Sequence, residues 1–495
     1  MTVQNESNLA PRDYNKWVVW LALFNSLLGM AAFGYSLAAI NIIQDYLTYV
    51  IFGWSDDAAT TYISWLNSVV TIGACVGSVS GGSLAKHLGR RRSMMMMDIV
   101  GTFAIMLTLF PSYPLMLLGR SIAGIYVGFN TVVVSVYVRE LAPAQVKGLA
   151  GALIQGMVCG GSMLCSGFGL GVPNSVERAA GERNSWWRFI LGFPMILTFI
   201  RFVVLWEVCP FEPPQYLIMT NQDEAAKLAL ERIYQGESIT LEYEFLKRVR
   251  EKTSQGNKIT YRDLLGPEYR TRFFVGLFIA ISQQYVGVNS LVFYSTAVFE
   301  LILGTENASK APTLTVIFGF CSLFTALISG SLTINRFGRK TILTYGLVGL
   351  AVMQTGIAYC GYTDHPMVMI AGIFTIALLF GLTWGPILWV ILPEILPDIG
   401  VGISSLVNLI GLFILAQFYQ KYYRAIGLPS AFMSFAALSF CAIFVVICCV
   451  KETKDLTPQE ITKAYNPKFY AKSEEAADSE ERTGFLESKA ESPEI

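Results

Sequence analysis

Long apolar runs alternate with short polar connections along most of the chain. A helix needs about 20 apolar residues to cross a membrane, and we count about twelve runs close to this length or longer. Their approximate limits are 17–43, 62–83, 94–111, 115–138, 148–170, 188–208, 273–301, 312–334, 341–361, 367–392, 402–421 and 429–450. The pattern predicts an all-α membrane protein with twelve transmembrane helices, and the frequent glycines within the runs favour close helix packing.

One longer polar stretch, 209–272, divides the runs into two groups of six. It contains the helix-like segments DEAAKLALERIY and LEYEFLKRVREK. We therefore expect a cytoplasmic N-terminus, an N-terminal six-helix bundle, a cytoplasmic helical linker, a C-terminal six-helix bundle and a partly disordered cytoplasmic tail. Their ranges are 1–16, 17–208, 209–272, 273–450 and 451–495. The tail is rich in Ser and Glu, a composition typical of disorder.

Lysine and arginine set the orientation, because loops on the cytoplasmic side carry an excess of both. With the N-terminus inside, the inner loops contain KHLGRRR and NRFGRK, whereas the outer loop after the first run has no Lys or Arg. Both termini are then expected in the cytoplasm, with the plasma membrane favoured over an internal one. Asn307-Ala308-Ser309 falls in an outer loop, where a glycosylation acceptor would be accessible.

Composition narrows the class further. The chain is 53% hydrophobic and 15% charged, and its formal net charge of zero implies no general attraction to nucleic acid. Most of the nine cysteines lie inside apolar runs, and with only two histidines there is no metal-ligand spacing. We see no phosphate-binding loop or nucleophile triad. The sequence therefore predicts neither an enzyme nor a cofactor.

The two groups of runs carry the same motifs in the same order. GRRR (89–92) follows the second run and GRK (338–340) follows the eighth, whereas ELAP (140–143) follows the fourth and EILP (394–397) the tenth. Two such matches at equivalent places indicate an internal duplication. A six-plus-six parallel repeat is typical of transporters that bind their substrate between the halves, near the middle of the membrane.

Further short motifs occur in a fixed order along 17–460. They are GYSLAAIN, GGSLAKHLGRRRSM, LGRSIAGIYVGF, VYVRELAP, KGLAGALIQGMVCGG, WWRFILGF, SQQYVGVNSLVFYST, NRFGRKT, TWGPILWVILPEILP and KETKDLTPQEI. In these motifs the chain resembles the sugar porters of the major facilitator superfamily, and most closely the facilitative hexose transporters. The resemblance implies transport of a sugar or polyol by alternating access, with membrane lipids as surroundings and a monomer as a sufficient unit.

The resemblance also implies where a sugar would bind. The matching positions are Gln155 on the fifth helix, Gln283, Gln284 and Asn289 on the seventh, and Trp389 on the tenth, with Tyr294 as an outer-gate aromatic. A primary amide offers two donors and an acceptor, which suits the hydroxyls of a sugar. The alternative is that the seventh-helix amides only bond neighbouring helices. On a straight helix Gln283 and Asn289 face about 120° apart, so a break near Gly287 would help to bring them together.

Several usual polar contacts of the family are missing. Leu323, Gly381 and Leu412 stand where polar residues are usual, so glucose is not expected specifically. Other polar residues could compensate, namely Ser322, Thr325, Asn408 and Gln417.

Charged residues inside the membrane indicate whether transport is coupled to protons, because carboxylates there mark proton relays. Ser36 stands where proton-coupled members have an aspartate, and Arg120 is retained on the fourth run. We find no carboxylate well inside the first five runs. We therefore expect uniport. A proton symporter, a porter of a non-sugar solute and a non-transporting nutrient sensor are the alternatives.

The resemblance places a gate of charged residues on the cytoplasmic side, whose pairing across the halves stabilises the outward-open state. The matching residues are Arg90, Glu140, Lys147, Glu212, Arg339 and Glu394. Gln215 and Val401 stand where arginines are usual. We therefore expect a thinner network than usual and a bias toward the inward-open state.

Overall fold

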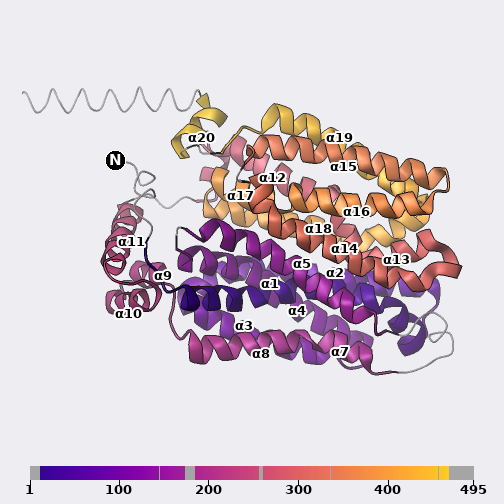
Figure 1. Cartoon of the computed structure of the whole chain (residues 1–495), viewed down its shortest axis with the longest axis horizontal. Coiled ribbons are helices and arrows are strands. Elements are labelled where there is room, and N and C mark those ends of the chain that lie inside the picture. Colours follow the sequence, from indigo (N-terminus) through magenta and orange to yellow (C-terminus); the bar gives the residue numbers. More distant parts are fainter. Residues whose placement is uncertain are drawn as a thin grey trace, which may run out of the picture.

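The computed structural model describes residues 12–143, 145–172, 184–255, 260–334, 336–454, 456 and 458–467. Within these ranges the chain is built from helices, with one isolated β-bridge between Tyr14 and Tyr234 (Figure 1). The tail beyond residue 467, for which disorder was expected, lies outside the described residues. The fold is all-α, as the sequence predicts.

The first six predicted runs correspond to helices that pack against one another. They are α1 (Lys16–Asp45), α2 (Asp56–Leu88), α3 (Arg90–Thr108), α4 (Tyr113–Leu141), α5 (Lys147–Gly169), and the pair α7 (Trp186–Gly192) and α8 (Pro194–Val203). Short π-helical turns extend α1 and α8, over Tyr46–Phe52 and Val204–Val208. We call this group the N half.

The last six runs form a second group, the C half. Its helices are α12 (Arg270–Tyr285), α13 (Val288–Asn307), α14 (Ala311–Ser329), α15 (Arg339–Tyr362), α16 (Pro366–Leu382), α17 (Trp384–Ile395), α18 (Asp398–Ile426) and α19 (Leu428–Cys449). Two of the runs are broken: Gly287 separates α12 from α13, and Thr383 separates α16 from α17.

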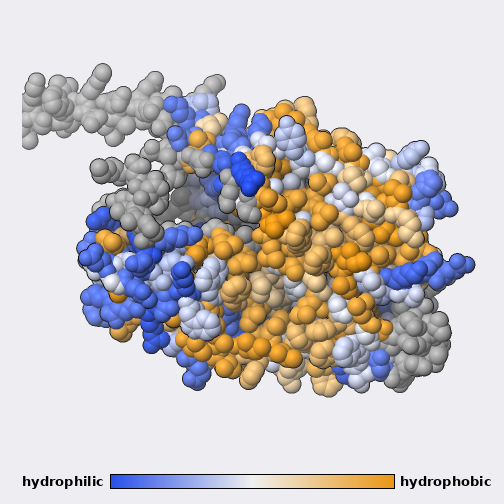
Figure 2. Space-filling view, viewed as in Figure 1, coloured by the Kyte–Doolittle hydropathy of each residue, from blue (hydrophilic) through white to orange (hydrophobic). Residues whose placement is uncertain are grey.

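The short helices α9 (Pro214–Met219), α10 (Asp223–Ile233) and α11 (Ser238–Gln255) gather at one end of the bundle, where α20 (Pro458–Tyr465) also lies (Figure 1). We call this the linker end, and the opposite end, toward which α13 runs, the distal end. Apolar side chains cover the flank between the two ends, whereas polar ones gather over α9–α11 (Figure 2).

The apolar flank belongs to helices long enough to span a membrane. Ten continuous helical stretches of the described residues meet that criterion. One of them, Arg270–Ser329, contains two of the predicted runs, and α3 accounts for a run outside the ten. Large apolar side chains such as Phe103 and Phe444 are exposed to the surroundings of the bundle, as a hydrocarbon environment permits.

Glycines bring helix backbones into direct contact within the N half. A Cβ atom added to Gly73 of α2 would lie 2.2 Å from the Ser121 carbonyl oxygen, and one on Gly128 of α4 would lie 2.0 Å from that of Ala74. Gly161 of α5 approaches α1 in the same way, at 1.9 Å from the Ala31 oxygen. No larger residue fits at these crossings, which is the packing that glycine-rich membrane helices use.

A buried ion pair corrects one sequence expectation. Asp98 lies inside the third run, only 1% exposed, and pairs with Arg201 of α8, which is fully buried. The Arg201 guanidinium also donates to the Asn130 side chain on α4 at 2.7 Å, and Asn25 of α1 donates to the Arg201 carbonyl at 3.2 Å. The expectation of no carboxylate well inside the early runs was wrong, because Asp98 itself lies within the third run. Only its pairing with Arg201 of the sixth run could not be read from the third run alone.

Candidate substrate pocket and gates

A cavity lies where the two halves meet. It is lined by α1 and α5 of the N half and by α13, α14, α16 and α17 of the C half, and it encloses about 670 Å³, including the part open to solvent. Its polar lining comprises Gln155 and Ser162 from α5, Asn289 from α13 and Ser322 from α14. The structure thus brings Gln155 and Asn289, two predicted sugar ligands from different halves, to one pocket.

The break at Gly287 positions Asn289. Gly287 has φ +82°, a left-handed conformation that glycine adopts readily, and an added Cβ would lie 2.5 Å from the Phe435 ring. The turn lets the Asn289 amide donate to Gln284 Oε1 at 2.8 Å, five residues earlier in the chain. A break near Gly287, which would help to bring the amides together, is therefore present.

The remaining seventh-run amides form a buried network around Asn408 of α18. Gln283 donates to the carbonyl oxygens of Trp384 and Gly385, at 3.3 and 3.0 Å, and accepts from Asn408 at 2.9 Å. Gln284 donates to Asn408 Oδ1 at 2.9 Å. In this conformation Gln283 and Gln284 bond neighbouring helices, as the alternative reading had it, and only Asn289 of the three lines the cavity.

The two predicted aromatic residues lie outside the pocket lining. The Trp389 side chain is 42% exposed on α17, whereas its neighbour Trp384 is buried and donates to the Leu343 carbonyl at 3.0 Å. Tyr294 is fully buried, and its hydroxyl donates to the Ala416 carbonyl of α18 at 2.5 Å. It lies beside Ser64 and Asn67 of α2, at the contact between the halves.

Hydrogen bonds join the halves near the distal end. Asn41 Nδ2 donates to Ser295 Oγ at 3.0 Å, Ser68 Oγ to Gln417 Oε1 at 2.5 Å, and Arg424 to Thr60 Oγ1 at 2.5 Å. Gln417, one of the polar residues that could compensate in the pocket, thus serves the contact between halves instead. Asn307 ends α13 on this side of the protein, and its side-chain oxygen accepts from Lys310 at 2.8 Å.

At the linker end the ion pairs of the repeated motifs lie within each half. Arg90 forms two hydrogen bonds to Glu140, at 2.9 and 2.8 Å, and Arg339 bonds Glu394 in the same way, with its shortest contact at 2.8 Å. Lys147 begins α5, but its side chain lies outside the described residues. Four of the predicted gate residues therefore pair inside their own half in this conformation.

The duplication extends to two carboxylates that each accept hydrogen bonds from the N-terminus of another helix. Glu212, after α8, accepts from the backbone N–H groups of Arg91 and Arg92 at 2.9 and 3.2 Å, at the start of α3. Glu452, after α19, accepts from those of Arg339 and Lys340 at 2.6 and 3.2 Å, at the start of α15. A carboxylate is favourable there because helix N-termini carry unsatisfied N–H groups. Sequence reasoning missed Glu452, although KETK follows the twelfth run as PFEP follows the sixth.

Thr325 explains the glycine at 381. A Cβ atom on Gly381 of α16 would lie 2.0 Å from Thr325 Oγ1 of α14. Residue 381 therefore cannot carry a side chain while the Thr325 hydroxyl keeps this position. Leu412, at another altered family position, is buried, and Leu323 lies opposite Gly160 of α5, 3.7 Å from a Cβ built there. All three residues thus take part in packing: Gly381 against Thr325, Leu323 near Gly160, and Leu412 in the buried core.

Gly381→Ala should lower the free energy of unfolding by about 1–3 kcal/mol, because the added methyl group overpacks α14 against α16. Thermal unfolding of the purified protein measures this. Adding Thr325→Ala removes the clashing oxygen and should restore part of the loss. Equal stability of Gly381→Ala and the parent chain would show that α14 and α16 separate freely.

Arg120 of α4 lies in the interior of the N half. It is 3% exposed, and it donates to the carbonyl oxygens of Leu66 and Ser36, at 3.1 and 2.7 Å. Both partners are neutral. Ser36 contributes its backbone oxygen to this contact.

Two pseudo-symmetric six-helix bundles, with apolar flanks and a neutral pocket between them, define a membrane transporter of the major facilitator fold. The model of the sugar (and other) transporter family matches residues 21–465, and the chain belongs to this family. The resemblance drawn from the sequence motifs is confirmed, and members of the family are transporters rather than enzymes.

Individual relatives agree with this assignment. The chain is 29% identical over 481 residues to hexose transporter 1 of Toxoplasma gondii, covering 90% of this chain and 82% of that protein. It is 27% identical over 475 residues to facilitated glucose transporter member 3, solute carrier family 2, of Canis lupus familiaris, covering 90% and 92%. The solved proton:xylose symporter XylE, bound to 6-bromo-6-deoxy-D-glucose, superposes with a TM-score of 0.75 at 22% identity, over 91% of this chain and 100% of that one. The last likeness shows the fold.

Proposed function

We propose that the protein is a uniporter that moves a hexose or a related sugar or polyol across a membrane by alternating access. The observation that carries the proposal is the neutral pocket between the halves, with polar groups from both. Amides and hydroxyls from Gln155, Ser162, Asn289 and Ser322 offer donors and acceptors without charge, which is what a neutral polyol requires. Trp389 remains our candidate for stacking on the sugar.

The rest of the pocket lining supports a sugar with fewer polar contacts than glucose makes in the family. Val158, Val292 and Phe380 line the pocket along with several glycines, whereas Leu323 and Leu412 lie outside its lining. A polar network of Gln283, Gln284 and Asn408 lies directly behind Asn289 and holds it in place. Millimolar binding, about 4 kcal/mol, needs only a few net hydrogen bonds at about 0.5–1.5 kcal/mol each.

The contacts between the halves support an inward-facing state. The hydrogen bonds between the halves lie near the distal end, whereas the Arg90–Glu140 and Arg339–Glu394 pairs at the linker end each stay within a half. We assign the linker end to the cytoplasm, together with both termini, and propose the plasma membrane as the location. In the outward-facing state the linker-end charges, with Lys147 and Glu212, would form the cytoplasmic gate, and Tyr294 would move with the distal contacts.

The state of the intramembrane charges supports uniport. Ser36 supplies no carboxylate, and Asp98 is held in a buried pair with Arg201 away from the substrate pocket. A carboxylate that releases and rebinds a proton during transport would need to lose such a partner in each cycle. The pocket therefore favours transport driven by the substrate gradient alone.

Reconstituted protein tests this directly. In liposomes with an imposed pH gradient, labelled sugar should equilibrate to the same final level with and without a proton uncoupler. Concentrative uptake that collapses with the uncoupler would establish the alternative, a proton symporter. A panel of glucose, fructose, galactose, xylose and myo-inositol in the same vesicles identifies the sugar, and no uptake of any of them would overturn sugar transport itself.

A further inference from the structure

Arg120 is a cation deep in the N half whose described hydrogen-bond partners are all neutral. Its Nε and Nη1 atoms donate to backbone carbonyl oxygens, and its Nη2 atom has no hydrogen-bond partner among the described residues. Burying an ion without an opposite charge is costly, and an unsatisfied donor adds to that cost. Asp98, by contrast, is already occupied by Arg201.

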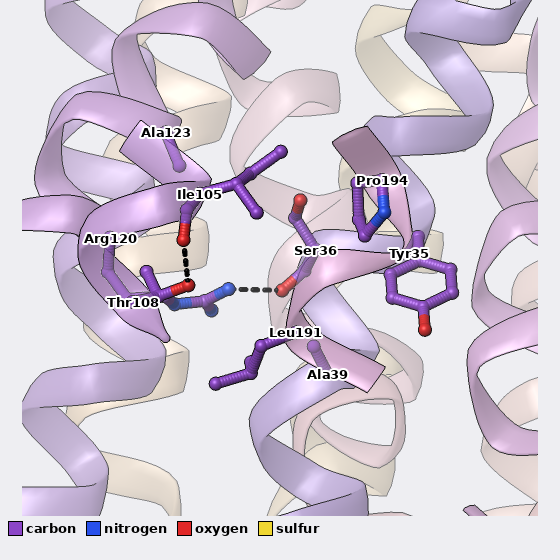
Figure 3. A pocket seen from close by; sticks show the side chains of 9 residues that line it. All are labelled: Tyr35, Ser36, Ala39, Ile105, Thr108, Arg120, Ala123, Leu191 and Pro194. Atoms are coloured by element: carbon purple, nitrogen blue, oxygen red, sulfur yellow. Dashed lines mark hydrogen bonds between the residues drawn. The ribbon is translucent and has the colours of Figure 1, made fainter. Parts of the chain in front are cut away.

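A cavity adjoins this guanidinium. It is lined by nine residues of α1, α3, α4, α7 and α8, among which Arg120, Ser36, Thr108 and Tyr35 are polar (Figure 3). In Figure 3 the guanidinium reaches across the cavity toward Ser36, and Thr108 lies next to it. The cavity is separate from the substrate pocket, since the two share no lining residue.

The other polar groups around the cavity leave few donors for a ligand. The Tyr35 hydroxyl donates to the Ile190 carbonyl at 2.8 Å and the Thr108 hydroxyl to that of Ile105 at 2.7 Å. The free donor capacity therefore rests on Arg120 Nη2. Ser36 lines the same cavity, with its side-chain oxygen turned away from the guanidinium (Figure 3). The buried thiol of Cys165 on α5 also interacts electrostatically with Arg120.

We propose that this cavity binds a small monovalent anion, of which a halide is the best fit, as the counter-ion of Arg120. A water molecule could accept from Nη2 but would leave the charge uncompensated. A phosphate or carboxylate has several acceptor oxygens and would need more donors than Nη2 and Ser36 provide. A single spherical anion satisfies the orphan donor and the charge together. The proposal concerns the N half alone and does not depend on which solute is transported.

The geometry suggests a variant in which residue 36 itself provides the negative charge that pairs with Arg120. Arg120 bonds the backbone oxygen of Ser36 at 2.7 Å, so the longer side chain of an aspartate at residue 36 can turn back to the guanidinium. Ser36→Asp should therefore fill the anion's place from within the chain. Arg120→Met removes the cation, and Arg188→Gln is the matched control, because Arg188 is an arginine of the same half that bonds a carbonyl, that of Leu109, on the exposed surface.

The test is thermal unfolding of the purified full chain in sodium chloride, sodium bromide or sodium gluconate at one fixed ionic strength. The parent chain and Arg188→Gln should gain a few degrees with rising halide, in a saturable way, as a ligand of the folded state requires. Ser36→Asp and Arg120→Met should show no halide-specific gain. If the Arg120 variant fails to fold, Ser36→Asp alone decides. Equal melting temperatures of the parent chain in halide and gluconate, or an undiminished halide gain in Ser36→Asp, would overturn the proposal.

Discussion

Asp98→Asn should lower the free energy of unfolding by about 3–5 kcal/mol, because it leaves the Arg201 guanidinium buried without its partner. Arg201 is fully buried and its carboxylate partner is 1% exposed, so water cannot replace the lost charge. The pair also ties α3 to α8, and Arg201 reaches Asn130 of α4. Thermal or denaturant unfolding in detergent, followed by helix content, measures the loss.

The double variant Asp98→Asn with Arg201→Gln is the control for this prediction. It removes both charges and leaves side chains that can hydrogen-bond each other, so part of the lost stability should return. If Asp98→Asn alone cost less than 1 kcal/mol, the pair would be dispensable, and the case for Asp98 as a permanently engaged carboxylate would fail with it.

Asn408→Leu should raise the KM of sugar uptake by tenfold or more. The change leaves Gln283 Oε1 and Gln284 Nε2 without the partner they share, and each buried unsatisfied group costs about 1–3 kcal/mol. Gln284 then turns toward other partners and releases Asn289, which it holds at the pocket through a 2.8 Å bond. Because tenfold in affinity is about 1.4 kcal/mol, loss of this positioning is enough. Initial uptake rates over a range of sugar concentrations give the KM.

Ser405→Ala provides the comparison on the same helix. Ser405 donates only to the Val401 carbonyl of its own helix, so its removal should leave KM within about twofold, the range expected of a residue outside the pocket. An unchanged KM for Asn408→Leu, with protein correctly inserted, would separate the amide network from sugar binding.

The fold was predictable because its signals are local. Hydropathy marked the runs now occupied by α1 to α5, by α7 and α8, and by α12 to α19. The repeated GRRR and ELAP motifs marked the equivalence of the halves that the Arg90–Glu140 and Arg339–Glu394 pairs now display. The family could be recognised from the sequence because each of its motifs is a short contiguous stretch, and the match to the family model confirms it.

The site was predictable only in part, because its geometry depends on pairs of distant residues. Gln155 and Asn289 meet in one pocket, and the break at Gly287 was expected from the spacing of the amides. The central role of Asn408 was open among several candidates, because nothing in its own run shows that it faces Gln283. Asp98 was overlooked although it can be read within the third run. Its pairing with Arg201 and the contact of Gly381 with Thr325 could not be foreseen, since both depend on how one helix packs against another.

The glycine crossings of the N half have a mechanical consequence. Where α2 touches α4 and α1 touches α5 backbone to backbone, no side chain lies between them to yield, so these helices cannot slide without breaking contact. The N half should then move as a rigid body, so that a displacement at one membrane face moves the other face as well. In the C half the helices are broken at Gly287 and Thr383. At these breaks the segments that line the pocket can change their angle when the halves move.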